Sequence, residues 1–580
     1  MHFSHLKIVA GIGKTGKLFV PLVNIMALAG KLCLLCQLNH KYSKTVHRFS
    51  STWKKRLIKQ EEIKETVYQF TVENATKLNE RIYVWGFAAT GALGIKSYLR
   101  PQKKQQPISC MNRPAQLKFF DSNRMKVNFF LYFFFFSFFP FFFFPFFLFF
   151  LFLFSFFFFS FFSFFFFSFF SFFLFSFFSF FLFSFFSFFL SFFNFFFYYF
   201  LFYLFLFSLF FLFIFFLFLS FFLVQNVACG YGFTLFLANH KGSQEVLGTG
   251  INTDSQVGYH PVDHKSERYL NYIIEPAKID LPLLHPSKTK VLSMDGGRAH
   301  TVLLTDTEGV FSFGNNAYGQ CGRSIIENEK YSGNATIHKI KELPDDVIEV
   351  ICGQDHTLFL TKTGTVYSCG LGSDGQTGLG HYQSIGQASQ VKGAIEGEKI
   401  VQIACSGDCV LALSDKGDVF GWGNSEYNQL ALITDHTQVN VPKNIPISAS
   451  CGKIIKVASG GSICGFLNES GEVFTWGYGI LGLGPNVQAT TTPTKLPSPL
   501  FGANEIDVGK KVVNLKCGVY HFAAITNHGD LYMWGKNKFG NLGFAHHKDQ
   551  FFPWRVSVPS EVLDVWCGVD HTVARCLPFS

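Results

Sequence analysis

Cysteine and histidine recur at fixed places in this 580-residue chain, and both side chains commonly bind metals or take part in catalysis. The recurring residues are Cys229, Cys352, Cys405, Cys517 and Cys567, and His300, His356, His521 and His571. Equivalent positions of a repeat lie in different structural units, so we do not expect these thiols to converge on one metal ion. We predict that the thiols are buried in the innermost strand of each repeat. We predict that the histidines are structural, with ring nitrogens that bond to the backbone of a neighbouring strand.

Two segments, residues 370–375 and 477–482, match the dinucleotide-binding pattern G-x-G-x-x-G. A dinucleotide site needs this turn between a strand and a helix, whereas here it falls inside a β repeat, so we interpret both segments as tight turns. No Ser/His/Asp arrangement and no pair of carboxylates with catalytic spacing stands out. We therefore predict that the chain is not a bond-making enzyme and has no cofactor or metal site.

Two short patterns alternate along the chain, and each occurs seven times. Pattern A is an apolar strand, a Cys-Gly type turn with two variable residues and often His, and a second apolar run. Its copies end at residues 233, 300, 356, 409, 463, 521 and 571. Pattern B is an aromatic-rich strand that ends in Trp-Gly or a relative, at residues 85, 247, 313, 369, 422, 476 and 534. A period of 50 to 60 residues with short strands and glycine turns is typical of a β-propeller blade.

The order of the two patterns predicts how the fold closes. The chain begins with an unpaired pattern B at residues 82–94 and ends with an unpaired pattern A at residues 564–576. In a linear array both would be frayed edges, whereas in a ring they complete one blade. We therefore predict an all-β, seven-bladed β-propeller, closed by pairing of its N- and C-terminal segments; a linear array is the alternative. The predicted propeller comprises residues 82–126 and 226–576.

A phenylalanine-rich, low-complexity insertion interrupts the repeat. Residues 129–222 contain 59 of the 81 Phe residues and no charged residue. The tract reads like translated polypyrimidine, any Val127 codon begins with GT, and Gln225 can be encoded by CAG. We interpret residues 127–225 as a retained intron or gene-model error; the alternative is a membrane-inserting or aggregating insertion. Removing these 99 residues shortens the first pattern-B interval from 162 to 63 residues, in line with the others.

The amino terminus is basic. Eleven of the 49 Lys and Arg residues and none of the 39 Asp and Glu residues lie in residues 1–60, so the rest of the chain is nearly neutral. Such an acid-free segment is typical of a mitochondrial presequence; a secretory signal and a solvated basic tail are the alternatives. We predict a presequence over residues 1–60, a linker over residues 61–81, and a mitochondrial location in the matrix or on the matrix side of the inner membrane. The near-neutral remainder argues against broad binding of nucleic acid.

The combination of Cys-Gly-x-x-His-Thr, as at residues 352–357, with Trp-Gly-x-Asn-x-x-Gly-Gln-x-Gly, as at residues 313–322, resembles the regulator of chromosome condensation (RCC) repeat family. The resemblance is strongest to the mitochondrial G-exchanging members of that family. It implies a seven-bladed propeller that promotes GDP release from a GTPase through one of its faces. Carried over from the family, the partner-binding positions are Asp355, Asp408, Tyr520 and Asp570. Ala299 and Ser462 occupy the same place without an ionisable group, so the match is partial.

Two classes of function follow from the resemblance. The first is a guanine-nucleotide exchange factor for a mitochondrial, dynamin-related GTPase of inner-membrane fusion, with peripheral association with that membrane. The alternative is a non-catalytic propeller scaffold for mitochondrial ribosome assembly, which binds assembly factors or rRNA. Acceleration of GDP release distinguishes the first class from the second.

Overall fold

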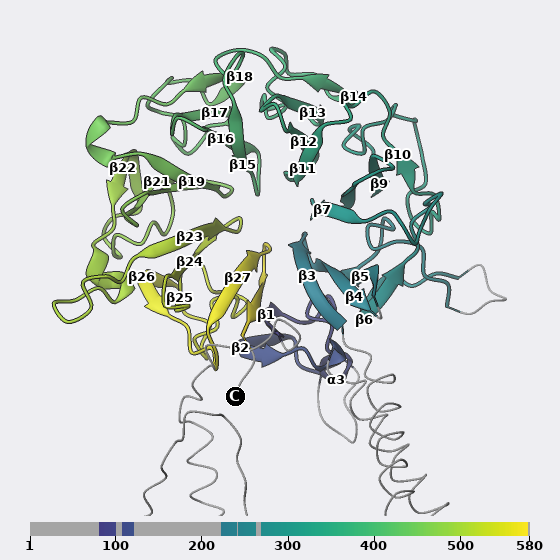
Figure 1. Ribbon diagram of the computed structural model, residues 1–580, viewed down its shortest axis with the longest axis horizontal. Helices are drawn as coiled ribbons and strands as arrows, with labels where there is room; N and C mark the ends of the chain where they lie inside the picture. The colour runs from purple at the N-terminus through teal and green to yellow at the C-terminus, as the bar shows by residue number, and fades with distance from the viewer. Residues whose placement is uncertain (1–79, 100–106, 121–221, 241, 263–267, 578–580) are drawn as a thin grey trace, which may run out of the picture. The chain divides into compact units, whose positions relative to one another are not determined.

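Seven four-stranded antiparallel sheets are arranged around a central axis (Figure 1). The computed structural model describes residues 80–99, 107–120, 222–240, 242–262 and 268–577. The predicted seven-bladed β-propeller is confirmed. The strands of blades 2 to 4 are β3 (Phe222–Cys229), β4 (Phe233–His240), β5 (Ser243–Ile251), β6 (Tyr272–Ile279), β7 (Val291–Gly296), β8 (His300–Thr305), β9 (Val310–Gly314), β10 (His338–Lys339), β11 (Val347–Cys352), β12 (His356–Thr361), β13 (Val366–Gly370) and β14 (Ile385–Gln390).

Blades 5 to 7 repeat the same up-and-down order. Their strands are β15 (Ile400–Ala404), β16 (Cys409–Ser414), β17 (Val419–Asn424), β18 (Gln438–Asn444), β19 (Ile454–Ser459), β20 (Ile463–Asn468), β21 (Val473–Tyr478), β22 (Ala489–Lys495), β23 (Val512–Cys517), β24 (His521–Thr526), β25 (Leu531–Gly535) and β26 (Gln550–Arg555). The first strand of each blade lies nearest the axis (Figure 1). The second strands are buried along their whole length in most blades, because neighbouring blades cover both of their sides.

Blade 1 is built from both ends of the repeat region. Strands β1 (Arg81–Phe87) and β2 (Cys110–Gln116) join β27 (Val562–Cys567) and β28 (His571–Cys576) in the order β2-β1-β28-β27. β1 pairs with β28 from Arg81 opposite Cys576 to Gly86 opposite His571. The orphan pattern B therefore completes the blade that the orphan pattern A begins, as the order of the patterns predicts.

The strand limits differ from the sequence boundaries at two places. β1 begins at Arg81, one residue before the predicted start of the propeller, and β3 begins at Phe222, inside the segment assigned to the insertion. Val224 is buried in the core between blades 1 and 2, so it serves the propeller. The predicted presequence and nearly all of the predicted linker and insertion lie outside the described residues.

The glycine that ends pattern B has a positive φ in every blade. In blade 2 this glycine is Gly250, opposite Phe233, and not Gly248 of the predicted Leu247-Gly248 pair. Between the third and fourth strands the register shifts at this glycine, as at Gly370 and Gly423, whose φ values are +111° and +98°. A Cβ atom on Gly423 would lie 2.1 Å from the carbonyl oxygen of Asp408. Only glycine satisfies both conditions. The segments 370–375 and 477–482 occupy such turns after β13 and β21, and not a strand-to-helix crossover.

The core lies between blades, and tryptophans tie adjacent blades together. Trp85, Trp422, Trp476 and Trp534 are completely buried. The indole N–H of Trp422 donates to the carbonyl oxygen of Gln376 at 3.0 Å, and that of Trp476 donates to Gln429 at 2.8 Å. Each bond reaches the preceding blade, so the Trp of pattern B aligns one sheet on the next. Helix is scarce: α3 (Lys96–Leu99) has four residues, and no helix in the described ranges is long and apolar enough to cross a membrane.

Candidate interaction face

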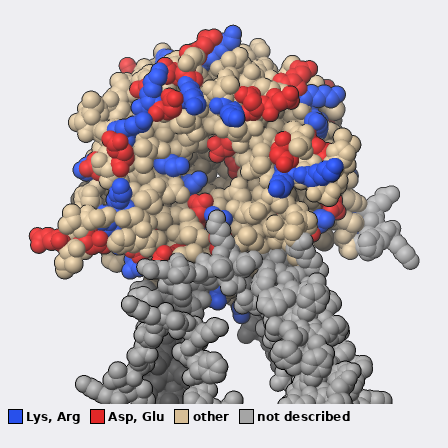
Figure 2. Space-filling model, in the orientation of Figure 1, with Lys and Arg blue, Asp and Glu red and all other residues tan. Residues whose placement is uncertain are grey.

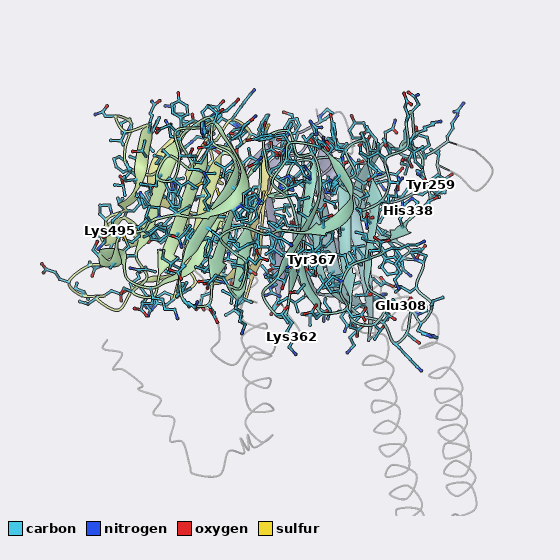
Figure 3. All side chains as sticks on the ribbon, turned by 90° about the horizontal axis from the view of Figure 1, so that it is seen from above. Tyr259, Glu308, His338, Lys362, Tyr367 and Lys495 are labelled. Carbon is cyan, nitrogen blue, oxygen red and sulfur yellow. The ribbon has the colours of Figure 1, made fainter. Side chains whose placement is uncertain are left out.

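One face of the propeller carries the turns inside pattern A and the turns that follow pattern B. The turns between first and second strands and those between third and fourth strands emerge on the same side, because the strands alternate in direction; we call this side the turn face. Glu308 and Lys362, which lie in turns between second and third strands, mark the opposite side (Figure 3). Acidic and basic side chains are interspersed over the face in view in Figure 2.

The pattern-A turns have a common construction around the repeat histidine. The histidine ring folds back over the glycine of Cys-Gly-x-x-His, and a Cβ atom on Gly353 would lie 2.0 Å from the ring of His356. The glycine and the histidine are therefore required together. His300, His356, His521 and His571 are completely buried.

Each repeat histidine bonds to a side chain of the next blade. Nε2 of His300 lies 3.0 Å from Oγ1 of Thr357, and that hydroxyl donates to the carbonyl oxygen of Gln320 at 2.7 Å. The hydroxyl therefore accepts from the ring, which fixes the Nε2–H tautomer. His521 and His571 contact Thr572 and Thr234 in the same way. The predicted bonding to backbone is wrong: the acceptor is a side chain, which for His356 is the thiol of Cys405 at 3.5 Å.

Burial also sets the charge of three of these rings. It lowers the pKa of His300, His356 and His521 to about 3, so they are neutral at physiological pH. The ring of His571 makes two contacts: its Nδ1 lies 3.0 Å from Oδ1 of Asp570, and its Nε2 lies 2.9 Å from the Thr234 hydroxyl. That hydroxyl donates to the carbonyl oxygen of Ala92. Both ring nitrogens of His571 therefore face acceptors.

The four residues carried over from the family lie at the same turn position in blades 4, 5, 7 and 1, and their environments differ. Asp355 is only 3% exposed and makes a two-point ion pair with Arg298 of blade 3, with Nη2–Oδ2 at 2.6 Å and Nε–Oδ1 at 3.2 Å. Burial raises the pKa of Asp355, and Arg298 opposes that rise. Asp570 bonds inward to His571. These two carboxylates link parts of the propeller.

Asp408 and Tyr520 are the more accessible pair. The side chain of Asp408 is 23% exposed and accepts from Nε2 of Gln376 at 3.3 Å. Burial and then the nearby Asp374 carboxylate raise the pKa of Asp408 to about 6. Tyr520 is 43% exposed, and the ammonium of Lys536 lies 4.6 Å from its ring centre. Of the four candidates, these two are best placed to touch a partner.

Tyr231 reaches across the axis at the turn face, a contact that the sequence analysis did not predict. Its hydroxyl donates to the carbonyl oxygen of Ser406 at 3.1 Å, across the ring from blade 2 to blade 5. The Ser406 hydroxyl donates in turn to the carbonyl oxygen of Cys517 in blade 7 at 3.0 Å. Burial raises the pKa of Tyr231. A sequence signal existed, because Tyr231 is the only aromatic residue at its position among the seven pattern-A turns.

Under this bridge lies an axial pocket of about 130 Å³. It is lined by all five recurring cysteines, together with Asp295 and Lys516. The expectation that the thiols belong to separate blades holds, yet they face one pocket. Burial raises the pKa of each thiol, so all five are protonated and weakly nucleophilic at neutral pH. Within the described part of the chain, no group of three or more His, Cys, Asp or Glu side chains is placed to hold a metal ion.

Sequence comparison places this architecture among known repeats. Five segments match the family described as the regulator of chromosome condensation (RCC1) repeat: residues 308–360, 363–413, 416–467, 470–525 and 528–575. The chain is 51% identical over 356 residues to the RCC1-like G exchanging factor-like protein of Mus musculus, covering 61% of this chain and 77% of that protein. The human protein of the same name is 49% identical over 356 residues, covering 61% and 76%.

Structural comparison agrees. The crystal structure of human WBSCR16 superimposes with a TM-score of 0.64 at 37% identity, covering 86% of this chain and all of that one. Yeast RCC1 (Prp20), solved bound to Kap60, superimposes with a TM-score of 0.57 at 16% identity, covering 90% and 92%. At that identity the second likeness concerns the fold alone.

Proposed function

Because the chain belongs to the regulator of chromosome condensation (RCC1) repeat family, we propose that it is a guanine-nucleotide exchange factor of this type. We infer that its substrate is a mitochondrial, dynamin-related GTPase of inner-membrane fusion. The observation that carries the proposal is about half identity to relatives named as G exchanging factor-like proteins, over three quarters of their length. Exchange is a binding activity, so the chain makes and breaks no covalent bond.

The turn face offers groups suited to this task. The Tyr231 bridge spans the axis at the centre of this face. At its centre the Asp408 carboxylate is available to attract the phosphate-binding lysine of a GTPase or to repel the magnesium-bound phosphates. Either effect weakens the hold on GDP. Asp355 and Asp570 support this surface from below through Arg298 and His571.

Release of a fluorescent GDP analogue from the purified GTPase tests the proposal. We expect the chain to accelerate release, and Asp408→Asn to reduce that acceleration about tenfold, the usual loss when one well-placed charged contact is removed from an interface. Asp345→Asn, an exposed acid on the opposite face, is the control and retains full activity. Binding of the GTPase without faster release would favour the scaffold function instead.

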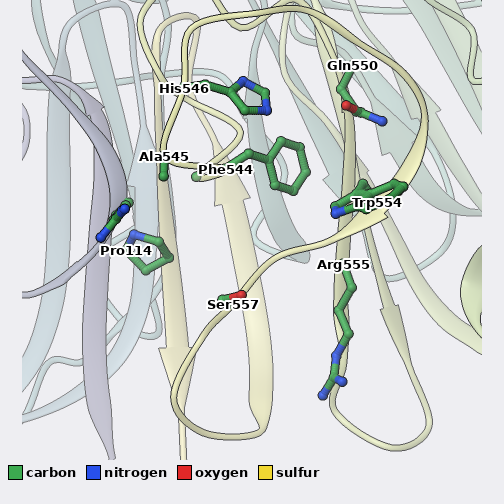
Figure 4. A pocket seen from close by; sticks show the side chains of 10 residues that line it. Pro114, Phe544, Ala545, His546, Gln550, Trp554, Arg555 and Ser557 are labelled. Atoms are coloured by element: carbon green, nitrogen blue, oxygen red, sulfur yellow. The ribbon is translucent and has the colours of Figure 1, made fainter. Parts of the chain in front are cut away.

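The scaffold function has an observation of its own. A pocket of about 680 Å³ opens between blades 7 and 1, and Trp554, Phe544 and His546 line it beside Arg113 and Arg555 (Figure 4). Trp554 is 61% exposed. Aromatic rings beside the exposed Arg113 guanidinium suit stacked bases and phosphates of single-stranded RNA, whereas the guanidinium of Arg555 is already paired with Asp530. In a scaffold for mitochondrial ribosome assembly, we expect Trp554→Ala to weaken binding of a uridine oligonucleotide and Tyr272→Ala, on the outer strand of blade 2, to leave it unchanged.

We also infer a mitochondrial location, on the matrix side, with peripheral attachment to the inner membrane. The basic, acid-free residues 1–60 support it. A fluorescent protein fused behind residues 1–60 is expected to enter mitochondria, and replacement of their eleven Lys and Arg residues by Gln is expected to abolish entry. Delivery of the fusion to the secretory pathway would contradict the inference.

A further inference from the structure

Exposed and half-buried aromatic side chains gather on one sector of the turn face. Tyr427 follows β17 in blade 5, Tyr478 ends β21 in blade 6, Tyr520 and Phe539 lie in the turns of blade 7, and Phe87 ends β1 in blade 1. We call these five residues the aromatic arc. Tyr427, Tyr478 and Tyr520 are 44%, 48% and 43% exposed. The arc follows four consecutive blades, from blade 5 to blade 1.

The members of the arc support one another in pairs. The rings of Tyr427 and Tyr478 are stacked at 5.6 Å with an interplanar angle of 22°, although they come from different blades. Phe87 and Phe539 contact each other at 4.8 Å across the seam between blades 1 and 7. These contacts hold the rings in place before any partner arrives, so little side-chain entropy is lost on binding.

Two ammonium groups accompany the rings. Nζ of Lys536 lies 4.6 Å from the ring centre of Tyr520, and Nζ of Lys538 lies 5.3 Å from that of Phe539. Both lysines are exposed. Towards the axis the surface turns acidic at Asp408. The sector therefore has an aromatic centre, basic groups on one part and a carboxylate on its inner side.

We propose that the aromatic arc is the main docking surface for the protein partner. The partner would present an apolar ridge flanked by carboxylates, which meet Lys536 and Lys538. Tyrosine is enriched among residues that dominate interface energy, and a pre-packed cluster is their usual setting. The inference rests on the proposed function for its choice of a GTPase as partner, and it extends that function from the centre of the turn face to this sector.

The local surroundings favour protein over RNA. Tyr427 and Tyr478 stack on each other, so one face of each ring is already used and is closed to a base. The exposed Glu426 lies next to Tyr427, and Asp408 lies towards the axis. These carboxylates repel a phosphate backbone and complement a protein surface of mixed charge.

Site-specific photo-crosslinking tests the docking surface without assuming the partner. A benzophenone amino acid replaces Tyr478 in the full chain expressed in cells, and a matched chain carries it at Tyr272, which is 52% exposed on β6. We expect position 478, and not position 272, to give a discrete adduct with a protein identified by mass spectrometry. Adducts with RNA alone, or the same pattern at both positions, would overturn the inference.

The identity of the adduct separates the two proposals. A GTPase adduct at position 478 supports both, whereas a different protein there leaves the arc as a docking surface and refutes the GTPase partner. The isolated adduct protein then serves as the probe for affinity measurements. We expect the double variant Tyr427→Ala/Tyr478→Ala to weaken its binding about thirtyfold. An unchanged affinity, with Tyr272→Ala also unchanged, would overturn the arc even if an adduct forms.

Discussion

The repeat histidine connects one blade to the next through a hydrogen bond, and its surroundings set its tautomer and its pKa. Its recurrence in the sequence indicates a structural part, because a catalytic group is not needed in four blades. The sequence cannot reveal the hydrogen-bond partner of the ring, because the threonine that bonds to His300 lies 57 residues away, in the next blade. The three positions without histidine hold Phe233, Cys409 and Ile463, all buried. At two of these three positions, Phe233 and Ile463, a large apolar side chain fills the place, so volume comes before the hydrogen bond there.

This order predicts a difference between two substitutions at His521. His521→Ala leaves a cavity and removes the bond to Thr572, so we expect a loss of about 3 kcal/mol in the free energy of unfolding. His521→Ile, which copies the residue used in blade 6, fills the space, and its loss should be about 1 kcal/mol. Denaturant unfolding of the two variants measures both. Equal losses would show that the hydrogen bond, and not the volume, is what matters.

Asp295 gives the propeller a pH dependence of its own. Burial raises its pKa to about 7, opposed by the backbone N–H groups of Cys352 and Gly296, while Glu349 and Lys516 face it from other blades with opposite effects. The unfolded carboxyl titrates near about 4, so the folded state holds the extra proton between these values. Stability from Asp295 is therefore fully present below about pH 4 and is lost as pH rises towards 7.

We expect Asp295→Asn to remove this contribution. The melting temperature of the variant minus that of the parent chain should rise between pH 4 and 7 and level off above pH 8. The difference cancels the three low-pKa histidines, which act in the other direction by losing stability as pH falls below 6.5. Asp345→Asn, exposed on the opposite face, should show no such rise. If the difference for Asp295→Asn does not change with pH, the pKa of the Asp295 carboxyl in the folded chain lies outside this range.

At the scale of elements, the first strand of blade 2 shows what a repeat pattern can and cannot locate. The innermost strands share the order buried, exposed, half-buried, buried, as at residues 347–350 and 562–565. Val224, Gln225, Asn226 and Val227 follow the same order. The first two were assigned to the insertion because Gln225 can be encoded by CAG, which set the boundary inside the strand.

The same order predicts the result of removing residues 127–225. In the joined chain Met125 takes the buried place of Val224, and Lys126 takes the exposed place of Gln225, so the register is preserved. Phe120 already packs against Phe236 of blade 2, with ring centres 5.2 Å apart, so residues 121–124 suffice as a connection. We expect this variant to give one cooperative melting transition and a β-rich circular dichroism spectrum.

Removing one residue more is the matched control. Deletion of residues 126–225 moves Arg124 to the buried place, where an unpaired guanidinium costs about 3 kcal/mol or more. That variant should melt several degrees lower. If the two deletions behave alike, β3 does not depend on this register.

At the scale of the whole molecule, closure is the feature most fully predicted from the sequence. Seven copies of each pattern and one orphan at each end imply the ring, and the pairing of β1 with β28 confirms it. The sites were less accessible to sequence reasoning. Turn position alone could not show that Asp355 and Asp570 face inward, and contacts across the axis, such as that of Tyr231, join residues far apart in the sequence. The repeat pattern shows the residues that all blades share, whereas these contacts depend on residues that differ from blade to blade.

Sharing one blade between the two ends should stabilise the ring. Arg81 lies opposite Cys576, so a two-residue turn can join them into a hairpin. A circular permutant built in this way and opened at Ile506, which is 99% exposed between blades 6 and 7, has no shared blade. We expect it to fold and to melt at a lower temperature than a chain with the natural order over the same residues. An equal or higher melting temperature would mean that strand pairing adds nothing to closure.

The bridge from Tyr231 through Ser406 to Cys517 has a mechanical consequence. Most contacts in the ring run along its circumference, from each blade to the next. This one runs along a diameter, like the spoke of a wheel, and couples blades 2, 5 and 7, which are not neighbours. A force applied to one edge of the disc is therefore shared with the far side. Tyr231→Phe removes the hydrogen bond between Tyr231 and Ser406. We expect backbone hydrogen exchange to become faster in β15 and β23 as well as in β3.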